Sequence, residues 1–382
     1  MNLALSIYRY FPHGGLQRDF RQVLERLQQR GHRCRVYTGQ WQGERPAGID
    51  LQLVPVRAFS NHGRVANFQR WVARDLQARP VDGHIGFNKM PGLDVCFVGD
   101  TCFTARPASG LAARLATLGA RYRHHVASER AVFAPQAATD ILLLNEPQRQ
   151  AYAAQYGTPE HRMHLLPPGV NPQRRAPDDA AQRREKMRAS LGLTGGEYVW
   201  LCVGSQFHTK GLDRALNALA EAAQQQPAAD LRLLVVGAGK VRAYQRQAKK
   251  LGVLSKVQFL GAREDILDLM LAADLLLHTP RREAGGTVLL EAIAAGLPIV
   301  TTANCGYASH VVAARCGRVL AEPFDPQALV SGVLRFIDGV LRADCREAAL
   351  LYARLTDLYS MHERAAALIE QRVAARSGRE LG

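Results

Sequence analysis

Short apolar runs alternate with amphipathic stretches along the first half of the chain. The runs that predict buried strands cover residues 3–7, 34–38, 51–54, 84–87, 93–98, 139–144 and 163–166. The apolar residues after the first run recur at the spacing of one helix face: Leu16, Phe20, Val23, Leu24 and Leu27. A second helix is predicted over residues 61–79. Alternation of strand and helix predicts an α/β domain.

The second half alternates more regularly and predicts a doubly wound parallel sheet. Its predicted strands cover residues 198–203, 231–236, 256–260, 274–278 and 298–301. The proline-rich run 167–172 and the polar segment 173–188 separate the halves, so we place a domain boundary there. The expected domains are 1–169 and 170–355, and a helix within 356–382 is expected to return to the first domain.

Residues 281–292 carry the clearest candidate chemistry of the second half. Glu283 and Glu291 stand on either side of Gly285-Gly286-Thr287, which predicts a loop turning into a helix. We expect Thr287 to cap this helix and Gly296 to end it. Unpaired N–H groups in a first helical turn suit phosphate, so a bound diphosphate would have a carboxylate near each end. An amphipathic helix with two solvated acids explains the same spacing.

Other loops after predicted strands carry groups suited to phosphate or sugar. Gly14 and Gly15 follow the first strand, where glycine lets backbone N–H groups approach a phosphate. Lys210 follows the strand at 198–203, and its flexible ammonium can track diphosphate oxygens. Polar residues also follow strands of the first half, at the edge where open α/β sheets bind ligands: Asn88, Lys89 and Asp100. Each of these could instead cap a loop.

Residues 103–133 combine an apolar stripe with arginines on both of its borders. The stripe consists of Leu111, Leu115, Leu118, Tyr122, Val126 and Phe133. The bordering arginines are Arg114, Arg121, Arg123 and Arg130. Such a helix suits the interface of an anionic bilayer, where guanidinium groups reach the headgroups. The alternative is a helix packed into the core with solvated arginines.

The net charge of +15 adds the expectation of an acidic partner. Nucleic acid, an anionic membrane surface and a phosphorylated substrate all qualify. No helix-turn-helix, zinc-finger or RNA-binding signature accompanies the charge, so a nucleic-acid partner is not expected. The sequence contains no apolar run long enough to span a bilayer. Its amino terminus predicts a first strand rather than a signal peptide.

Cysteine and glycine patterns point away from a metal or a dinucleotide. The seven cysteines are scattered and odd in number, which predicts reduced core residues rather than disulfides or a zinc site. Gly237-Ala238-Gly239 follows a predicted strand, but it does not complete the GxGxxG motif of dinucleotide-binding proteins.

Taken together, three motifs resemble those of retaining glycosyltransferases of family four, which have the GT-B fold. They are Glu283-x7-Glu291 enclosing Ala284-Gly285-Gly286-Thr287, Gly14-Gly15 after the first strand, and Lys210-Gly211. Longer motifs in the first half are similar to the lipopolysaccharide core glucosyltransferase I family: residues 10–20, 61–64, 86–94 and 121–124. The resemblance covers essentially the whole chain.

This resemblance implies two Rossmann-like domains facing across a cleft, with UDP-glucose bound mainly by the second and the acceptor by the first. It implies transfer of glucose, with retained configuration, onto an inner-core heptose of a lipid-A-linked oligosaccharide. The place implied is the cytosolic face of the inner membrane. No metal or other cofactor is implied, because Lys210 and helix N–H groups would neutralise the leaving diphosphate.

The resemblance also implies roles for individual residues. The donor-binding set is Gly14, Gly15, Lys210, Arg263, Glu283, Ala284, Gly285, Gly286, Thr287 and Glu291. Within it, Glu291 would bind the ribose and Arg263 the uracil region. The acceptor-binding set is Asp19, Asn88, Lys89 and Asp100, and the catalytic residues are Asp100, Glu283 and Lys210. The family often has a second basic residue near the phosphate lysine, where this chain has Ser205 and Thr209.

Two other functions are compatible with the sequence. The same chemistry could serve a different UDP-sugar or glycan acceptor, because one or two contacts decide between epimers. A basic membrane- or nucleic-acid-binding protein on a degenerate GT-B scaffold is the non-enzymatic alternative. The intact set of glycines, lysine and glutamates argues against degeneration.

Overall fold

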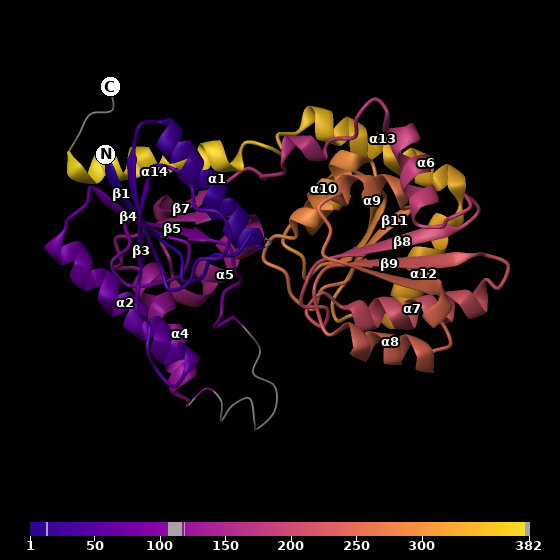
Figure 1. Cartoon of the computed structure of the whole chain (residues 1–382), viewed down its shortest axis with the longest axis horizontal. Coiled ribbons are helices and arrows are strands. Elements are labelled where there is room, and N and C mark those ends of the chain that lie inside the picture. Colours follow the sequence, from indigo (N-terminus) through magenta and orange to yellow (C-terminus); the bar gives the residue numbers. More distant parts are fainter. Residues whose placement is uncertain (13, 106–116, 118, 379–382) are drawn as a thin grey trace. The chain divides into compact units, whose positions relative to one another are not determined.

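The computed structural model describes residues 1–12, 14–105, 117 and 119–378, which form two compact α/β units (Figure 1). Unit 1 comprises Met1–Gly169 and the segment from Ser360 onward, and unit 2 spans Val170–Tyr359. Each unit has a parallel sheet with helices on both faces. This architecture confirms the predicted fold class of two doubly wound domains.

Over its described residues, unit 1 has a seven-stranded sheet in the order β3-β2-β1-β4-β5-β6-β7. The strands are β1 (Asn2–Ser6), β2 (Arg33–Thr38), β3 (Ile49–Leu53), β4 (Gly83–Gly86), β5 (Val95–Val98), β6 (Asp140–Leu143) and β7 (Met163–Leu165). The helices are α1 (Gly15–Gln29), α2 (Asn61–Ala78), α4 (Ala120–Phe133), α5 (Glu146–Tyr156) and α14 (Met361–Ser377). The apolar face of α1 is buried as its periodicity predicts.

Unit 2 has a six-stranded sheet in the order β10-β9-β8-β11-β12-β13. Its strands are β8 (Tyr198–Val203), β9 (Leu231–Val236), β10 (Val257–Gly261), β11 (Leu275–His278), β12 (Ile299–Thr302) and β13 (Gly317–Leu320). Its helices are α6 (Ala180–Ser190), α7 (Leu212–Gln225), α8 (Val241–Lys250), α9 (Ile266–Ala272), α10 (Thr287–Ala295), α11 (Ala308–Ala313), α12 (Pro326–Leu334) and α13 (Gly339–Leu355).

The strand order of unit 2 creates a specific place for a ligand. β8 and β11 are neighbours, and the chain continues from them toward opposite edges of the sheet. At such a switch point the loops beyond the strand ends diverge and leave a crevice, where open parallel sheets bind their ligands. The loops 204–211 and 279–286 follow these two strands.

Several elements of unit 2 were not predicted from the sequence, among them α6 and β13. Helix α6 lies in the segment predicted to be a polar boundary, and it is anchored by charge: Arg183 contacts Asp268 at 2.5 Å, Arg184 contacts Asp274 at 2.6 Å, and Arg188 contacts Glu197 at 3.1 Å. Strand β13 is only four residues long and carries Arg318, so its apolar pattern is weak.

No helix in the described part of the chain is long and apolar enough to cross a membrane. All seven cysteines are free thiols, as predicted, and six of them are buried.

Candidate functional site

The loops after β8 and β11 bring Lys210 and Glu283 together as an ion pair. Lys210 lies just before α7, and Glu283 lies four residues before α10. His278, the last residue of β11, is buried and places its Nε2 3.7 Å from the Glu283 carboxylate. These three side chains therefore form one cluster at the switch point of the sheet.

This cluster keeps Glu283 charged. Burial alone raises the pKa of Glu283, but the neighbouring His278 ring and the Lys210 ammonium outweigh it and bring the pKa to about 2. Burial lowers the pKa of His278, so its ring is neutral near pH 7. With its side chain only 18% exposed, Glu283 is not the solvated acid of the alternative interpretation.

Backbone hydrogen bonds hold the loop that carries Glu283. They run from Arg281 N to Thr209 O (2.9 Å), from Glu283 N to Asn304 O (3.0 Å) and from Tyr307 N to Gly285 O (2.8 Å). Gly286 has a φ of 86°, in the left-handed region, and a Cβ there would lie 2.2 Å from Cys305 Sγ. The position therefore requires glycine.

The predicted cap of α10 is wrong by one residue. Gly286 is the N-cap, in a left-handed conformation and without a side-chain hydrogen bond, and Thr287 is already inside the helix. The left-handed turn at Gly286 starts the helix one residue earlier than a side-chain cap at Thr287 would. The helix ends at Gly296, as predicted.

Glu291 lies one turn inside α10 and has a different basic partner. Its side chain is buried, and the Nε of Arg174 lies 3.7 Å from its carboxylate. Arg174 Nη1 also donates to the carbonyl of Glu264 at 3.4 Å. Arg174 thus joins Glu291 to the loop of Arg263, whose guanidinium makes hydrogen bonds of 2.8 and 2.5 Å with Asp265.

Sequence reasoning missed both His278 and Arg174. His278 ends an apolar strand at the ligand-binding edge, so a polar residue there was an available signal. Arg174 follows the proline-rich break, and its proximity to Glu291 depends on tertiary structure. Arg281 also lies near the loop of Lys210, but both its terminal nitrogens contact Asp213, at 2.8 and 2.7 Å.

In unit 1, two of the predicted acceptor residues, Lys89 and Asp100, belong to one cluster of charged side chains. The side chain of Lys89 is only 9% exposed, and its ammonium lies 2.6 Å from Glu129 and 2.9 Å from Asp100. Burial by itself lowers the pKa of Lys89, but the carboxylates of Asp100 and Glu129 outweigh this effect. The pKa is therefore raised above its usual value, and the ammonium stays charged. Glu129 also accepts from the Tyr156 hydroxyl at 2.8 Å. The Asp100 side chain is 68% exposed and is the accessible member of this cluster.

The other predicted residues of unit 1 lie around α1 and its neighbouring loops. Gly14 is the N-cap of α1, and Gly15 is its first residue. Asn88 Oδ1 accepts a hydrogen bond from the backbone N–H of Tyr8 at 2.7 Å. Asp19 contacts His362 of α14 at 3.0 Å. The ligand-binding roles of these residues stay predictions.

Three of the four arginines predicted to meet a membrane lie on α4. Arg121, Arg123 and Arg130 are exposed, whereas the carboxyl end of the helix is buried at Val132 and Phe133. Arg114 and the first apolar residues of the stripe, Leu111, Leu115 and Leu118, lie outside the described residues.

Comparisons with known proteins agree on one family. Residues 183–351 match the model of "Glycosyl transferases group 1". The lipopolysaccharide glucosyltransferase WaaG of Escherichia coli K12 is 44% identical over 373 residues, which cover 97% of this chain and 98% of that protein. A crystal structure of WaaG, a glycosyltransferase involved in lipopolysaccharide biosynthesis, superposes with a TM-score of 0.91 at 43% identity, covering 96% of this chain and 99% of that one.

More distant structures share the fold alone. Anabaena HepE, solved with UDP and glucose, has a TM-score of 0.73 at 18% identity over 97% of this chain and all of that one. The near-complete overlap with WaaG in both sequence and structure confirms the predicted family. The chain belongs to the WaaG family of lipopolysaccharide core glucosyltransferases, with the GT-B fold.

Proposed function

We propose that the chain transfers glucose from UDP-glucose onto an inner-core heptose of a lipid-A-linked oligosaccharide, with retained configuration and without a metal ion. The observation that carries this proposal is the Lys210–Glu283 pair at the switch point of unit 2, in a chain 44% identical to WaaG. UDP-glucose is a substrate here, and no other cofactor is required.

Lys210 and the start of α10 would hold the diphosphate. The first N–H groups of a helix have no carbonyl one turn earlier to bond, so they are available to phosphate oxygens. Lys210 is paired with Glu283. A diphosphate would draw the ammonium to its own oxygens and free the carboxylate to accept hydrogen bonds from glucose hydroxyls. The charge that builds on the leaving UDP would then face a fixed cation.

The nucleoside would bind beside Arg174. Glu291 would accept hydrogen bonds from the ribose hydroxyls, and Arg263 would lie near the uracil. The bond from Arg174 to the Glu264 carbonyl places these two residues in one region of unit 2. In unit 1, Gly14 and Gly15 at the start of α1 would offer backbone N–H groups to a phosphate.

Asp100 would contact the acceptor, either as a base or through a sugar hydroxyl, because it is the exposed carboxylate of the Lys89 cluster. Lys89 would fix Asp100 in place. The acceptor is attached to a lipid, so the enzyme would work as a peripheral protein on the cytosolic face of the inner membrane. The arginines of α4, together with Arg114, would contact the anionic surface, and no nucleic acid takes part.

A UDP-release assay with purified acceptor lipid tests the proposal. UDP-glucose, UDP-galactose and UDP-N-acetylglucosamine are supplied in parallel, with and without a chelator. We expect rapid release only from UDP-glucose, undiminished by the chelator, and a product with the α configuration of the donor by NMR. A faster reaction with another donor would replace glucose in the proposal, and loss of activity with the chelator would contradict the metal-free mechanism.

A further inference from the structure

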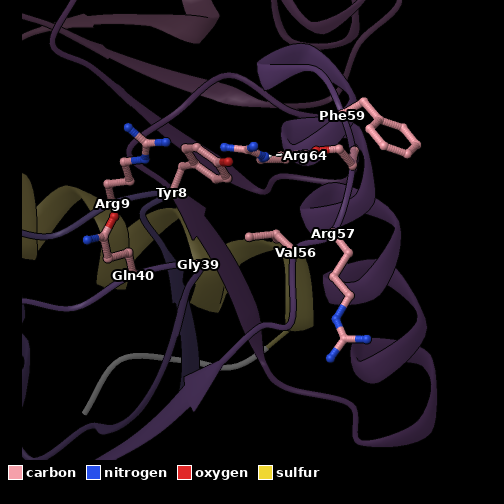
Figure 2. A pocket seen from close by; sticks show the side chains of 9 residues that line it. Tyr8, Arg9, Gly39, Gln40, Val56, Arg57, Phe59 and Arg64 are labelled. Carbon is pink, nitrogen blue, oxygen red and sulfur yellow. Dashed lines mark hydrogen bonds between the residues drawn. The ribbon is translucent and has the colours of Figure 1, made fainter.

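Unit 1 contains a cavity of about 590 Å³ at the carboxyl ends of β1, β2 and β3 (Figure 2). Tyr8 and Arg9 follow β1, Gln40 follows β2, Arg57 follows β3, and Arg64 lies in the first turn of α2. This volume lies within the range of small-molecule sites. None of the residues assigned a role above lines this cavity.

Three arginines line the cavity, and no acidic residue is among its lining residues. Arg9, Arg57 and Arg64 form no ion pair with any carboxylate that the structure describes. Two neighbouring arginines of the same unit are, by contrast, paired with carboxylates: Arg35 contacts Asp50 at 3.1 Å and Arg79 contacts Asp75 at 2.7 Å. Uncompensated guanidinium groups in a concave site favour an anionic ligand.

In Figure 2 the guanidinium groups of Arg9 and Arg64 lie on either side of the Tyr8 ring, and that of Arg57 is directed away from them. The guanidinium carbon of Arg9 is 5.4 Å from the centre of the Tyr8 ring. Arg64 donates from Nε to the carbonyl of Ala58 at 3.0 Å, which fixes the side chain and leaves both terminal nitrogens for a ligand. The Tyr8 ring packs edge-on against buried Phe68 at 5.5 Å.

Two hydrogen bonds connect this cavity to the loops with predicted ligand contacts. The Tyr8 backbone N–H donates to Asn88, a predicted acceptor residue, at 2.7 Å. The carbonyl of Arg9 accepts from Gln17 Nε2 at 3.1 Å, two residues beyond Gly15. The loops that line the cavity therefore contact the loop of Asn88 and the helix that begins at Gly15.

We propose that this arginine cavity is a second acceptor subsite, which binds an acid-bearing sugar of the acceptor glycan. Arg9 and Arg64 bind the oxyanion, a phosphate or a carboxylate, and the Tyr8 ring packs against the sugar ring. An oxyanion alone would occupy a small part of the volume, which leaves room for the saccharide. The inference rests on the proposed function, because an acceptor glycan is what unit 1 would bind.

Kinetics of single variants test the contacts. We expect Arg9→Gln and Arg64→Gln each to raise the KM for the acceptor lipid roughly tenfold or more, the scale of a charged hydrogen bond, with kcat and UDP affinity unchanged. Arg64→Lys keeps the charge without the planar fork, so its loss should be smaller. Arg74→Gln, on an exposed arginine of α2 that does not line the cavity, is the matched control and should change nothing.

Direct binding identifies the anion independently of activity. The purified chain is titrated by NMR with mannose 6-phosphate, glucuronate, mannose and inorganic phosphate. Binding of mannose 6-phosphate assigns the oxyanion to a phosphate, and binding of glucuronate assigns it to a carboxylate. Either result supports the subsite if Arg9→Gln/Arg64→Gln abolishes it and mannose binds weakly. Inorganic phosphate binding as tightly as the charged sugars would overturn the saccharide contact.

The two proposals can fail separately. Normal glucosylation with an unchanged acceptor KM in Arg9→Gln/Arg64→Gln would overturn the subsite and keep the proposed function. Binding of a charged sugar through Arg9 and Arg64, in a chain that releases no UDP with acceptor lipid, would keep the subsite and reject the proposed function.

Discussion

At the scale of single residues, the structure pairs two groups that the proposed catalysis would separate, Lys210 and Glu283. Lys210 and Glu283 neutralise each other, and the pKa of about 2 keeps Glu283 ionised throughout the range in which enzymes are assayed. A diphosphate that takes Lys210 as its partner therefore meets a cation already positioned at the switch point. Binding of the diphosphate would therefore exchange one partner of Lys210 for another.

Lys210→Ala is expected to lower turnover by roughly two to three powers of ten, the scale of losing one preorganised electrostatic contact. The reason is that the ammonium faces charge that develops on the leaving UDP. Turnover is measured at saturating UDP-glucose, with Lys249→Ala, an exposed lysine of α8, as the matched control. Normal turnover by a folded Lys210→Ala protein would contradict the role.

The two glutamates are expected to have different functions. Glu291→Ala should mainly weaken UDP binding, because the ribose is held alike before and during the reaction. Glu283→Ala should spare UDP affinity and reduce transfer, because its proposed partner is the sugar. Calorimetric titration of UDP into both variants, alongside transfer rates, separates the two effects. Equal losses of UDP affinity would refute this division.

Lys210 and Glu283 could be selected from the sequence because each lies in a short loop after a predicted strand, and Glu291 because it follows Glu283 at close spacing. The residues that contact the two glutamates, His278 and Arg174, could not be selected in this way. His278 contacts Glu283 because a strand end is buried beside the loop, and Arg174 reaches Glu291 from a segment far along the chain. Burial and tertiary proximity create these pairs, and neither leaves a periodic signature.

At the scale of helices and strands, apolar periodicity predicted the elements that pack through an apolar face. It did not predict helix α6, which is held by ion pairs. The face of α1 that carries Phe20, Val23 and Leu24 is fully buried, so its pattern is strong. Helix α6 is anchored by arginines that contact carboxylates, so its sequence looked like a linker.

Helix α4 carries a prediction at this scale. Replacing its exposed arginines and Arg114 by glutamine should abolish co-sedimentation with anionic liposomes. Each arginine near such a surface contributes on the order of 1 kcal/mol, so four should cost several. The variant comprises Arg114→Gln, Arg121→Gln, Arg123→Gln and Arg130→Gln.

The matched control removes four exposed cations of α8 in unit 2: Arg242, Arg246, Lys249 and Lys250. Binding should survive in this control, should require anionic lipid and should weaken with salt. UDP affinity should persist in both variants, since neither helix carries a residue of the proposed donor-binding set. If the wild-type protein does not bind anionic liposomes at low salt, the membrane role of α4 is rejected, and α4 is a helix packed on the core with solvated arginines.

At the scale of the whole molecule, the chain leaves unit 1 at Gly169 and returns to it at Ser360. The last helix, α14, lies alongside α1 (yellow and indigo in Figure 1). Apolar contacts and ion pairs both hold it, because Ile369 and Val373 are fully buried and Arg30 contacts Glu370 at 2.7 Å. Its sequence predicted a helix, whereas its partner emerges only from the fold.

The net charge is also a property of the whole molecule. A net charge of +15 predicts an acidic partner, but composition cannot say where that partner binds. The structure distinguishes two kinds of arginine. Some form internal ion pairs, as Arg188 of α6 does with Glu197, and others line the cavity beside Tyr8. Arg9, Arg57 and Arg64 form no ion pair with a described carboxylate, so they are open to an anionic ligand.

Because α14 packs on unit 1, damage to this helix should weaken unit 1 and spare unit 2. Ile369→Ala removes a fully buried side chain, a change that typically costs about 2–5 kcal/mol. Hydrogen exchange should show lost protection in β1 and α1, with β8 and α7 unchanged, and UDP affinity should persist. Leu355→Ala, at an exposed leucine of α13, is the control for a change of the same size. Equal loss of protection in both units would mean that the two unfold as one, and the assignment of α14 to unit 1 alone would be wrong.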